Sequence, residues 1–220
     1  MSDLEEKIKE QYGKRKHLNP LYNSYYSMRT MHERGEKLRE LLESHQCRDK
    51  SLLEIGAGHG GNIPMLLMCG FKKENLHLNE LLAERIKAIN ENYGEYKLFE
   101  GDFLKIDFGQ KYDYVFQSTV FSSILDTATR KAIANKMWDL LKPGGYILWY
   151  DFVFNNPNNN QVRKVTANEV KSLFPGALHT EFHKITLAPP IGRRVGKLYS
   201  LFNLPFLRTH ILALLQKPEA

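Results

Sequence analysis

The sequence predicts an α/β fold in which a mostly parallel, doubly wound sheet carries helices on both faces. Three observations lead to this prediction. Apolar, strand-like stretches alternate with helical patterns, a glycine-rich segment follows the first strand, and residues 1–50 carry no strand signal. Each parallel return between strands requires a crossover, usually a helix, so the alternation favours parallel pairing. A chain of 220 residues is expected to form one domain. We expect a helical extension over 1–50 and an α/β domain over 51–220.

The expected elements follow one another in a regular order. Strands are predicted at Ser51–Ile55, Asn75–Glu80, Tyr96–Glu100, Tyr112–Gln117, Gly145–Asp151, Phe182–Leu187 and Thr209–Gln216. Helices are predicted at Gly61–Met68, Leu81–Asn92, Thr129–Leu141, Ala167–Phe174 and Arg194–Phe202. Thr166 is a predicted N-cap because Glu169 follows it at capping-box spacing. The stretch "KPGG" (residues 142–145) ends one helix and precedes a strand.

Composition limits the classes of protein that this chain can belong to. The amino terminus lacks the layout of a signal peptide, and no apolar run approaches the roughly 18 residues of a membrane span. Cys47 and Cys69 have no metal-ligand spacing, and the histidines form no such pattern, so no metal is expected. These features favour a cytoplasmic protein. The net charge of +6 fits either surface solvation or attraction to an anionic partner.

The segment "LLEIGAGHGGN" (residues 52–62) breaks an apolar strand into alternating glycines. Glycine permits positive φ angles and close backbone approach, and the following helix start offers free N–H groups to a ligand. The spacing of Gly56, Gly58 and Gly61 also fits a dinucleotide fingerprint. However, Glu54 lies two residues before Gly56, where its charge would repel a pyrophosphate and favour a cationic ligand. The loop is therefore predicted to bind a ligand that carries an amine.

Two further carboxylates follow the next two strands. Glu80 ends the second strand, where a carboxylate can accept hydrogen bonds from ribose hydroxyls. Asp102 and Phe103 follow the third strand and offer a hydrogen-bond acceptor and an apolar wall for a purine ring. Each carboxylate alone is also consistent with a helix cap or a surface charge. Their position at consecutive strand ends favours one shared binding site.

With these motifs, the sequence resembles the class I S-adenosylmethionine-dependent methyltransferases. The resemblance covers about Ser51 to Asp151 and rests on "LLEIGAGHG", "LHLNE", "EGDF", "YDYVFQSTVFSSILD" and "LLKPGGYILWYD". It implies the strand order 3-2-1-4-5-7-6 with an antiparallel carboxyl-terminal strand, and S-adenosylmethionine as the cofactor. It also implies cofactor contacts, which we assign to Glu54, Gly56, Ala57, Gly58, Asn79, Glu80, Leu81, Gly101, Asp102, Phe103 and Gln117. Glu80 departs from the family in that Asp is more frequent there.

The methyl acceptor is expected over the carboxyl ends of the fourth and fifth strands. Asp151 is the leading candidate for a general base, and a carboxylate that braces the following loop is the equal alternative. His59 in the glycine loop and Tyr26 in a tyrosine-rich segment (residues 12–34) are the other catalytic candidates. That segment is expected to be either a helix on the sheet edge or a lid. The asparagines at 155–160 are turn formers first and hydrogen-bonding groups second.

The function expected from these features is methyl transfer to a small polar molecule or a glycan-type acceptor, through oxygen rather than nitrogen. The tail is loosely similar to methyltransferases encoded among bacterial surface-polysaccharide genes, which implies a phosphorylated or nucleotide- or lipid-linked sugar. An anionic acceptor is consistent with Arg193 and Arg194, which could hold a phosphate. No stable nucleic-acid partner is expected, because no nucleic-acid-reading module is recognised. Nucleic-acid methylation, nicotinamide-dependent oxidoreduction and a non-catalytic cofactor-binding scaffold stay open as alternatives.

Overall fold

Seven strands form one sheet in the order β3-β2-β1-β4-β5-β7-β6, which confirms the order that the resemblance implied. The computed structural model describes residues 24–155 and 161–219. The strands are β1 (Leu52–Ile55), β2 (Leu76–Glu80), β3 (Lys97–Glu100), β4 (Tyr112–Ser118), β5 (Leu141–Phe152), β6 (His179–Leu187) and β7 (Arg208–Gln216). β1 to β5 pair in parallel, and β7 runs antiparallel between β5 and β6. All seven predicted strands are present, and the closing antiparallel strand is confirmed.

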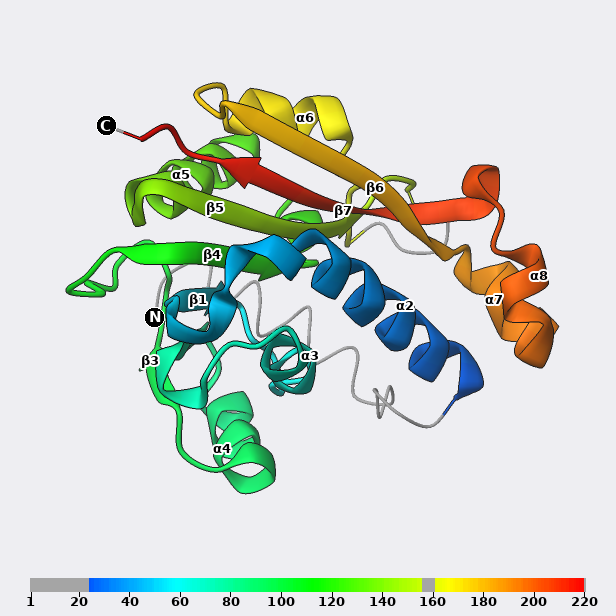
Figure 1. Cartoon of the computed structure of the whole chain (residues 1–220), viewed down its shortest axis with the longest axis horizontal. Helices are drawn as coiled ribbons and strands as arrows, with labels where there is room; N and C mark the ends of the chain where they lie inside the picture. The colour runs from blue at the N-terminus through cyan, green and yellow to red at the C-terminus, as the bar shows by residue number, and fades with distance from the viewer. Residues whose placement is uncertain (1–23, 156–160, 220) are drawn as a thin grey trace.

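Helices cover both faces of the sheet, as Figure 1 shows. They are α2 (Tyr25–Leu41), α3 (Ile63–Met68), α4 (Ala83–Tyr93), α5 (Thr127–Asp139), α6 (Ala167–Leu173), α7 (Pro189–Val195) and α8 (Tyr199–Phe202). On one face, Leu38 of α2 and Leu66 of α3 pack with Phe116 of β4. On the other face, Met137 of α5 and Val170 of α6 pack around the strands. Successive strand residues point to opposite faces, so each strand residue belongs to a known side.

Local sequence signals account for the helix starts. Thr166 caps α6, with its hydroxyl accepting from the backbone N–H of Glu169 at 3.2 Å, which confirms the predicted cap. Ser24 caps α2, and Asp126 caps α5 in the same manner. Side-chain acceptors of this kind satisfy the free N–H groups of a first helical turn.

The predicted helix at Arg194–Phe202 is wrong in its continuity. The structure has α7 and α8 instead, joined by a single turn of 3₁₀ helix at Gly196–Leu198. Gly196 has a φ of +51°, which an uninterrupted right-handed helix does not permit. The glycine therefore ends α7 and turns the chain before α8 begins.

The extension before β1 contains α2 and two 3₁₀ turns, Glu43–His45 and Cys47–Asp49. Residues 12–23 of the tyrosine-rich segment and residues 156–160 of the asparagine-rich loop lie outside the described part of the chain. Within the described part, no helix is long and apolar enough to cross a membrane.

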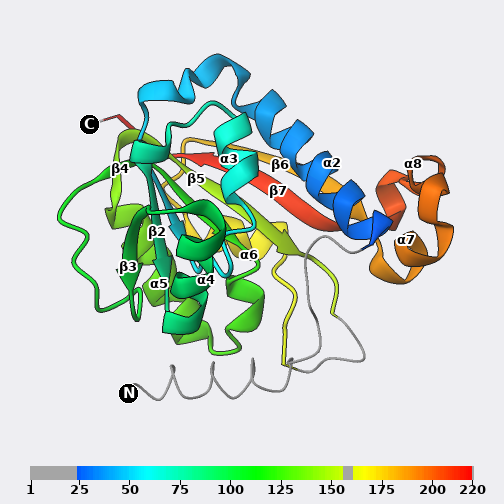
Figure 2. The ribbon, with the colours of Figure 1, turned by 90° about the horizontal axis from the view of Figure 1, so that it is seen from below.

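The carboxyl ends of the parallel strands share one edge of the sheet. β6 runs antiparallel to β7, and β7 runs antiparallel to β5, so β6 ends at this same edge. The connection from β6 to β7 therefore leaves the sheet where the glycine loop also lies. In Figures 1 and 2, its helices α7 and α8 lie beside the first turns of α2.

Candidate functional site

The glycine loop connects β1 to α3 and adopts the predicted left-handed backbone. Gly56 has a φ of +61° and Gly58 a φ of +60°. A Cβ on Gly56 would lie 2.7 Å from a methyl carbon of Val120, so this glycine allows close packing against the β4 loop. A Cβ on Gly58 would meet no atom of the described residues within 4 Å. The space beside Gly58 is therefore open to a ligand.

Glu54 lies at the end of β1 and is fully buried on the α2 side of the sheet. Its Oε1 accepts from the side-chain amide of Asn62 at 2.5 Å, whereas its buried Oε2 has no hydrogen-bond partner among residues 24–155 and 161–219. Burial raises the pKa of Glu54 to about 7, against the opposing effects of the Asn62 bond and the Arg34 charge. An unpartnered buried carboxylate oxygen is costly. It is a place where a cationic donor would be stabilised.

Arg34 joins α2 to this site, and sequence reasoning did not select it. Its guanidinium donates to Asn62 Oδ1 at 2.6 Å and to Ser118 Oγ at 3.1 Å. The same group lies over the ring of Tyr150, 4.7 Å from the centroid. Arg34 thus connects α2 with the start of α3 and the ends of β4 and β5. No spacing in the sequence signals this role, because Arg34 and its partners lie on separate elements.

Glu80 at the end of β2 faces the glycine loop. Its Oε2 accepts from the backbone N–H of Gly58 at 2.7 Å, and its Oε1 accepts from the N–H groups of Leu81 and Leu82. Neighbouring Asn79 donates its amide to the carbonyl oxygens of Phe99 and Gly101, both at 3.0 Å. Glu80 therefore lies between the glycine loop and α4, and Asn79 ties β2 to the end of β3.

The turn after β3 brings the other predicted residues to the same edge. Asp102 is half-buried, and its Oδ1 accepts from the N–H of Leu104 at 3.0 Å. Phe103 is buried against Phe108. Gln117 is fully buried and braces the β4 loop, donating to the carbonyl of Tyr150 and accepting from the N–H of Val120.

Asp151 points to the opposite face of the sheet from Glu54. It is fully buried, with Oδ2 accepting from the N–H of Ser122 at 3.1 Å and Oδ1 from its neighbour Phe152 at 2.9 Å. Burial raises its pKa to about 7. These contacts match the bracing alternative, since both oxygens are used by the backbone around the β4–α5 and β5 ends.

The other two catalytic candidates lie apart from one another. His59 is exposed at the tip of the glycine loop. Tyr26 lies at the start of α2, where its hydroxyl donates to the carbonyl of Leu187 at 2.8 Å and its ring contacts Tyr199. Burial raises the pKa of Tyr26 above its usual range. The structure therefore places Tyr26 among α7 and α8, in the same cluster as Leu187 and Tyr199.

Sequence reasoning also missed Glu33, which ties α2 to the β6–β7 connection. Its Oε2 accepts from Tyr199 Oη at 2.6 Å and from the N–H of Thr186 at 3.2 Å, and its Oε1 accepts from Asn203 at 2.7 Å. Thr186 has a φ of +67°, which is strained for a β-branched residue. The Thr186 hydroxyl is also 3.0 Å from Tyr150 Oη. α2 therefore holds the sheet edge through Glu33 and Arg34 together.

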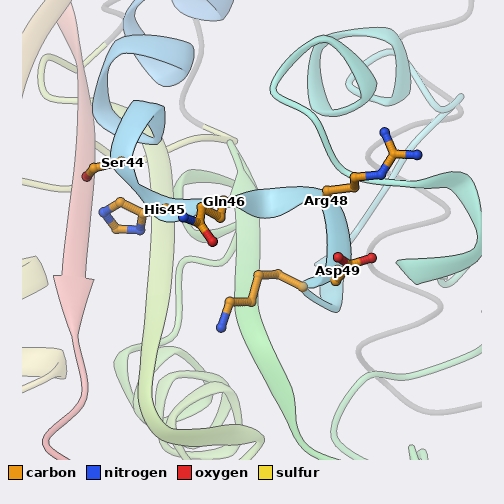
Figure 3. Close-up of a pocket in the computed structure, with 6 residues that line it drawn as sticks. Ser44, His45, Gln46, Arg48 and Asp49 are labelled. Atoms are coloured by element: carbon orange, nitrogen blue, oxygen red, sulfur yellow. The ribbon is translucent and has the colours of Figure 1, made fainter.

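A pocket at a different place is shown in Figure 3. Its lining residues precede β1 and are Ser44, His45, Gln46, Arg48, Asp49 and Lys50. It therefore lies at the amino-terminal edge of the sheet, opposite to the glycine loop. None of the predicted site residues lines it.

Comparisons with known proteins agree with this geometry. Residues 52–145 match a family model described as a methyltransferase domain. The chain is 27% identical over 133 residues to a malonyl-[acyl-carrier protein] O-methyltransferase of Calditerrivibrio nitroreducens, a match over 60% of this chain. The matched region covers 50% of that protein, so this chain spans about half the length of its curated relative.

Solved structures share the fold at low sequence identity. The N-methyltransferase NodS of Bradyrhizobium japonicum, in complex with S-adenosylhomocysteine, is 18% identical with a TM-score of 0.69. That likeness covers 95% of this chain and 98% of NodS. A S-adenosylmethionine-dependent methyltransferase of Archaeoglobus fulgidus is 14% identical with a TM-score of 0.57, over 88% of this chain and 100% of that one.

The residues at this edge fit the cofactor that the resemblance implies. The free oxygen of Glu54 suits an amine, and the space beside Gly58 leaves room for a ligand along the loop. Glu80 lies next to that space and carries the charge suited to hydroxyl donors. The sheet order and the glycine loop are those that the resemblance to class I S-adenosylmethionine-dependent methyltransferases implied, and residues 52–145 match the methyltransferase domain model.

Proposed function

We propose that the chain transfers the methyl group of S-adenosylmethionine to an oxygen atom of a small polar acceptor. The single observation that carries the proposal is the buried carboxylate of Glu54, whose Oε2 has no hydrogen-bond partner in the described part of the chain and lies beside the glycine loop. A dinucleotide pyrophosphate would be repelled at this position, whereas the ammonium group of the amino-acid end would be attracted. This charge pattern disfavours a nicotinamide enzyme.

Different residues at this edge of the sheet would bind different parts of the cofactor. Glu54 would orient the ammonium group, with Gly56, Ala57 and Gly58 supplying backbone contacts. Glu80 would accept hydrogen bonds from the ribose, and Asp102 with Phe103 would hold the adenine. The predicted contacts of Asn79, Leu81, Gly101 and Gln117 would position these groups. When bound, the cofactor supplies a methyl group already activated by a sulfonium.

The transfer itself is a displacement at carbon. The acceptor oxygen forms a bond to the methyl carbon while the carbon–sulfur bond breaks. The electron pair of the broken bond stays on the sulfur of S-adenosylhomocysteine. A hydroxyl acceptor also loses a proton, whereas a carboxylate acceptor does not. The chain's task is therefore mainly alignment and exclusion of water.

We assign Asp151 a positioning role, because its oxygens already accept from backbone N–H groups on the far face. It would fix the loop that follows Ser118, the last residue of β4 and a contact of Arg34. His59 and Tyr26 stay candidates for contact with the acceptor, His59 from the loop tip and Tyr26 from the start of α2.

Oxygen as the acceptor atom is supported by the match to an O-methyltransferase. Methyl transfer should therefore be tested on a panel of candidate acceptors. The panel should contain free and thioester-bound carboxylates as well as phosphorylated, nucleotide-linked and lipid-linked sugars. The sugars follow from the polar sequence around β4 and β5 and from the basic residues of α7. Product analysis would distinguish an O-methyl ester from an O-methyl ether.

A matched pair of glycine variants tests the cofactor site. Gly58 and Gly109 have φ angles of +60° and +66°, and a Cβ on either meets no atom of the described residues within 4 Å, but only Gly58 lies in the proposed site. Both alanine variants should lose about 1 kcal/mol of stability to the left-handed backbone. Gly58→Ala should also weaken S-adenosylhomocysteine binding by about tenfold or more, since its methyl group fills the ligand space.

The measurement is calorimetry with S-adenosylhomocysteine and with NADH, followed by transfer of labelled methyl groups to the acceptor panel. Equal binding by Gly58→Ala and Gly109→Ala would remove the loop from the site. Binding of NADH alone would overturn the proposed function. Cofactor binding with no transfer to any acceptor would favour the scaffold alternative.

A further inference from the structure

The connection between β6 and β7 exposes large apolar side chains to solvent. The exposed fractions are 54% for Leu198, 71% for Leu201, 41% for Phe202, 42% for Leu204 and 74% for Phe206. These five side chains, together with the exposed cations Arg193, Arg194 and Lys197, are called here the β6–β7 surface. A run of apolar side chains this dense on a surface marks an interaction site.

The β6–β7 surface rests on a fixed base. Tyr199 is fully buried, and its hydroxyl donates to Glu33 and accepts from the N–H of Leu187. Gly192 is buried so close to the Tyr26 ring that a Cβ would lie 2.2 Å from it. The inward residues are thus tied to α2, and the apolar ones face outward on a supported segment.

The acidic group that contacts the β6–β7 connection among the described residues is Glu33 of α2, which is used by Tyr199, Thr186 and Asn203. From Phe182 to Pro218 the sequence contains no Asp and no Glu, and its cations are Lys184, Arg193, Arg194, Lys197, Arg208 and Lys217. Helical segments that lie in a membrane interface combine Lys and Arg with Leu and Phe in this way. Anionic headgroups attract such cations. By contrast, leucine is under-represented among protein–protein hot spots, and lysine is depleted at the core of such interfaces.

We propose that the β6–β7 surface docks on an anionic lipid surface. Leu201 and Phe206 enter the boundary between headgroups and acyl chains, while Arg194 and Lys197 contact the phosphates. Because β6 ends at the same edge of the sheet as the glycine loop, docking brings the site's edge toward the lipid. The class of acceptor that fits this arrangement is one carried on a lipid, a point that rests on the proposed function, whereas lipid binding itself does not.

Vesicle binding by the full chain tests the proposal. The wild type should sediment with vesicles of mixed phosphatidylcholine and phosphatidylglycerol, much less with phosphatidylcholine alone, and less at high salt. Leu201→Ser with Phe206→Ser should weaken binding by about tenfold or more. Arg194→Gln with Lys197→Gln should weaken it by about 30-fold.

Control variants carry the same changes elsewhere on the surface. Leu178 and Met68 are 72% and 70% exposed, so Leu178→Ser with Met68→Ser matches the apolar change outside the β6–β7 surface. Lys131→Gln with Lys105→Gln removes two exposed cations outside the β6–β7 surface and so matches the charge change. These variants should bind anionic vesicles as the wild type does.

Several outcomes would overturn the proposal. Absence of wild-type binding to anionic vesicles is the first, and equal loss in the control variants is the second. A third is a wild-type dimer in sedimentation velocity that Leu201→Ser with Phe206→Ser dissociates, because the surface would then meet a second copy. Saturable binding of an acidic carrier protein without binding to vesicles would assign the surface to a protein. Calorimetry with S-adenosylhomocysteine on the same variants shows whether the cofactor site is intact. A loss of vesicle binding with unchanged S-adenosylhomocysteine binding belongs to the β6–β7 surface alone.

Discussion

At the scale of one residue, the burial of Glu54 and its place beside the cofactor site have opposite effects on the ionisation of its carboxyl group. The carboxyl group is fully buried, which favours its neutral form and raises its pKa to about 7. The same group has a free oxygen aimed at a site suited to an amine, which favours the ionised form. Binding of a cationic ligand should therefore release a proton from Glu54 in neutral solution.

This coupling predicts a pH dependence of cofactor binding. Below about pH 7, Glu54 must lose its proton before it can pair with the ammonium group, so affinity should fall by about tenfold per pH unit. Affinity should level off above that pH, since the carboxylate is already ionised. Calorimetry with S-adenosylhomocysteine in buffers of different ionisation enthalpy would count the released proton. Glu54→Gln should bind more weakly and without the pH slope, and a slope retained in that variant would assign the titration to another group.

At the scale of one element, α2 is fixed to the sheet edge by an acid and a base on successive residues. Arg34 reaches the start of α3 and the β4 loop, and Glu33 reaches Thr186, Tyr199 and Asn203. Neither residue was selected as a site residue from the sequence. The contacts of Glu33 and Arg34 depend on how α2 packs against the sheet. The helical pattern of the sequence does not indicate which residues of other elements they meet.

Removal of the Glu33 carboxylate should loosen α2 from α8. Glu33→Ala leaves three donors without their acceptor, one of them the backbone N–H of strained Thr186. The free energy of unfolding should fall by about 2 to 3 kcal/mol, with a smaller loss for Glu33→Gln. Urea denaturation would measure it.

The nearby Glu36→Ala is the control, because Glu36 is exposed and pairs only with His32 among the contacts described for it. That change should alter stability by less than about 0.5 kcal/mol. An equal loss for Glu33→Ala and Glu36→Ala would mean that the Glu33 contacts do not hold α2.

At the scale of the whole molecule, two kinds of buried titratable group oppose each other. Glu54 and Asp151 have pKa values raised to about 7, so the folded state holds protons that the unfolded state releases above about pH 4 to 5. Their contribution to stability is therefore present at low pH and is lost as the pH rises to about 7. His77 and His210 have pKa values lowered to about 4 by burial. Their contribution is present above about pH 6.5 and is lost as the pH falls.

The unfolding free energy of the wild type should therefore change little between about pH 5 and 6.5. Glu54→Gln combined with Asp151→Asn removes one of the two opposing contributions. The double variant should lose stability steadily as the pH falls through that window, because only the histidines then titrate. Denaturant titrations at several pH values would show this. A double variant with the same profile as the wild type would mean that the carboxyl groups do not titrate there.

The sequence predicted the sheet better than it predicted the site. Alternation of strands and helices is a repeated signal, so all seven strands appeared, and the resemblance added their order. The helix at 194–202 was predicted as one piece because its composition is helical, and the left-handed Gly196 divides it. The carboxylates at the strand ends were predicted because each follows an apolar strand directly. Asp151 was placed at the correct edge, but the sequence could not reveal that its side chain points to the far face.

The position of β7 has a consequence for synthesis. This strand is synthesised after β5 and β6, yet it lies between them and is hydrogen-bonded to both. While residues 208–216 of a nascent chain are still inside the ribosome, β6 has no strand to pair with. The edge of β5 that β7 later covers is then exposed. Exposed borders of this kind recruit other chains into aggregates. Premature termination upstream of Arg208 would therefore yield an aggregation-prone product.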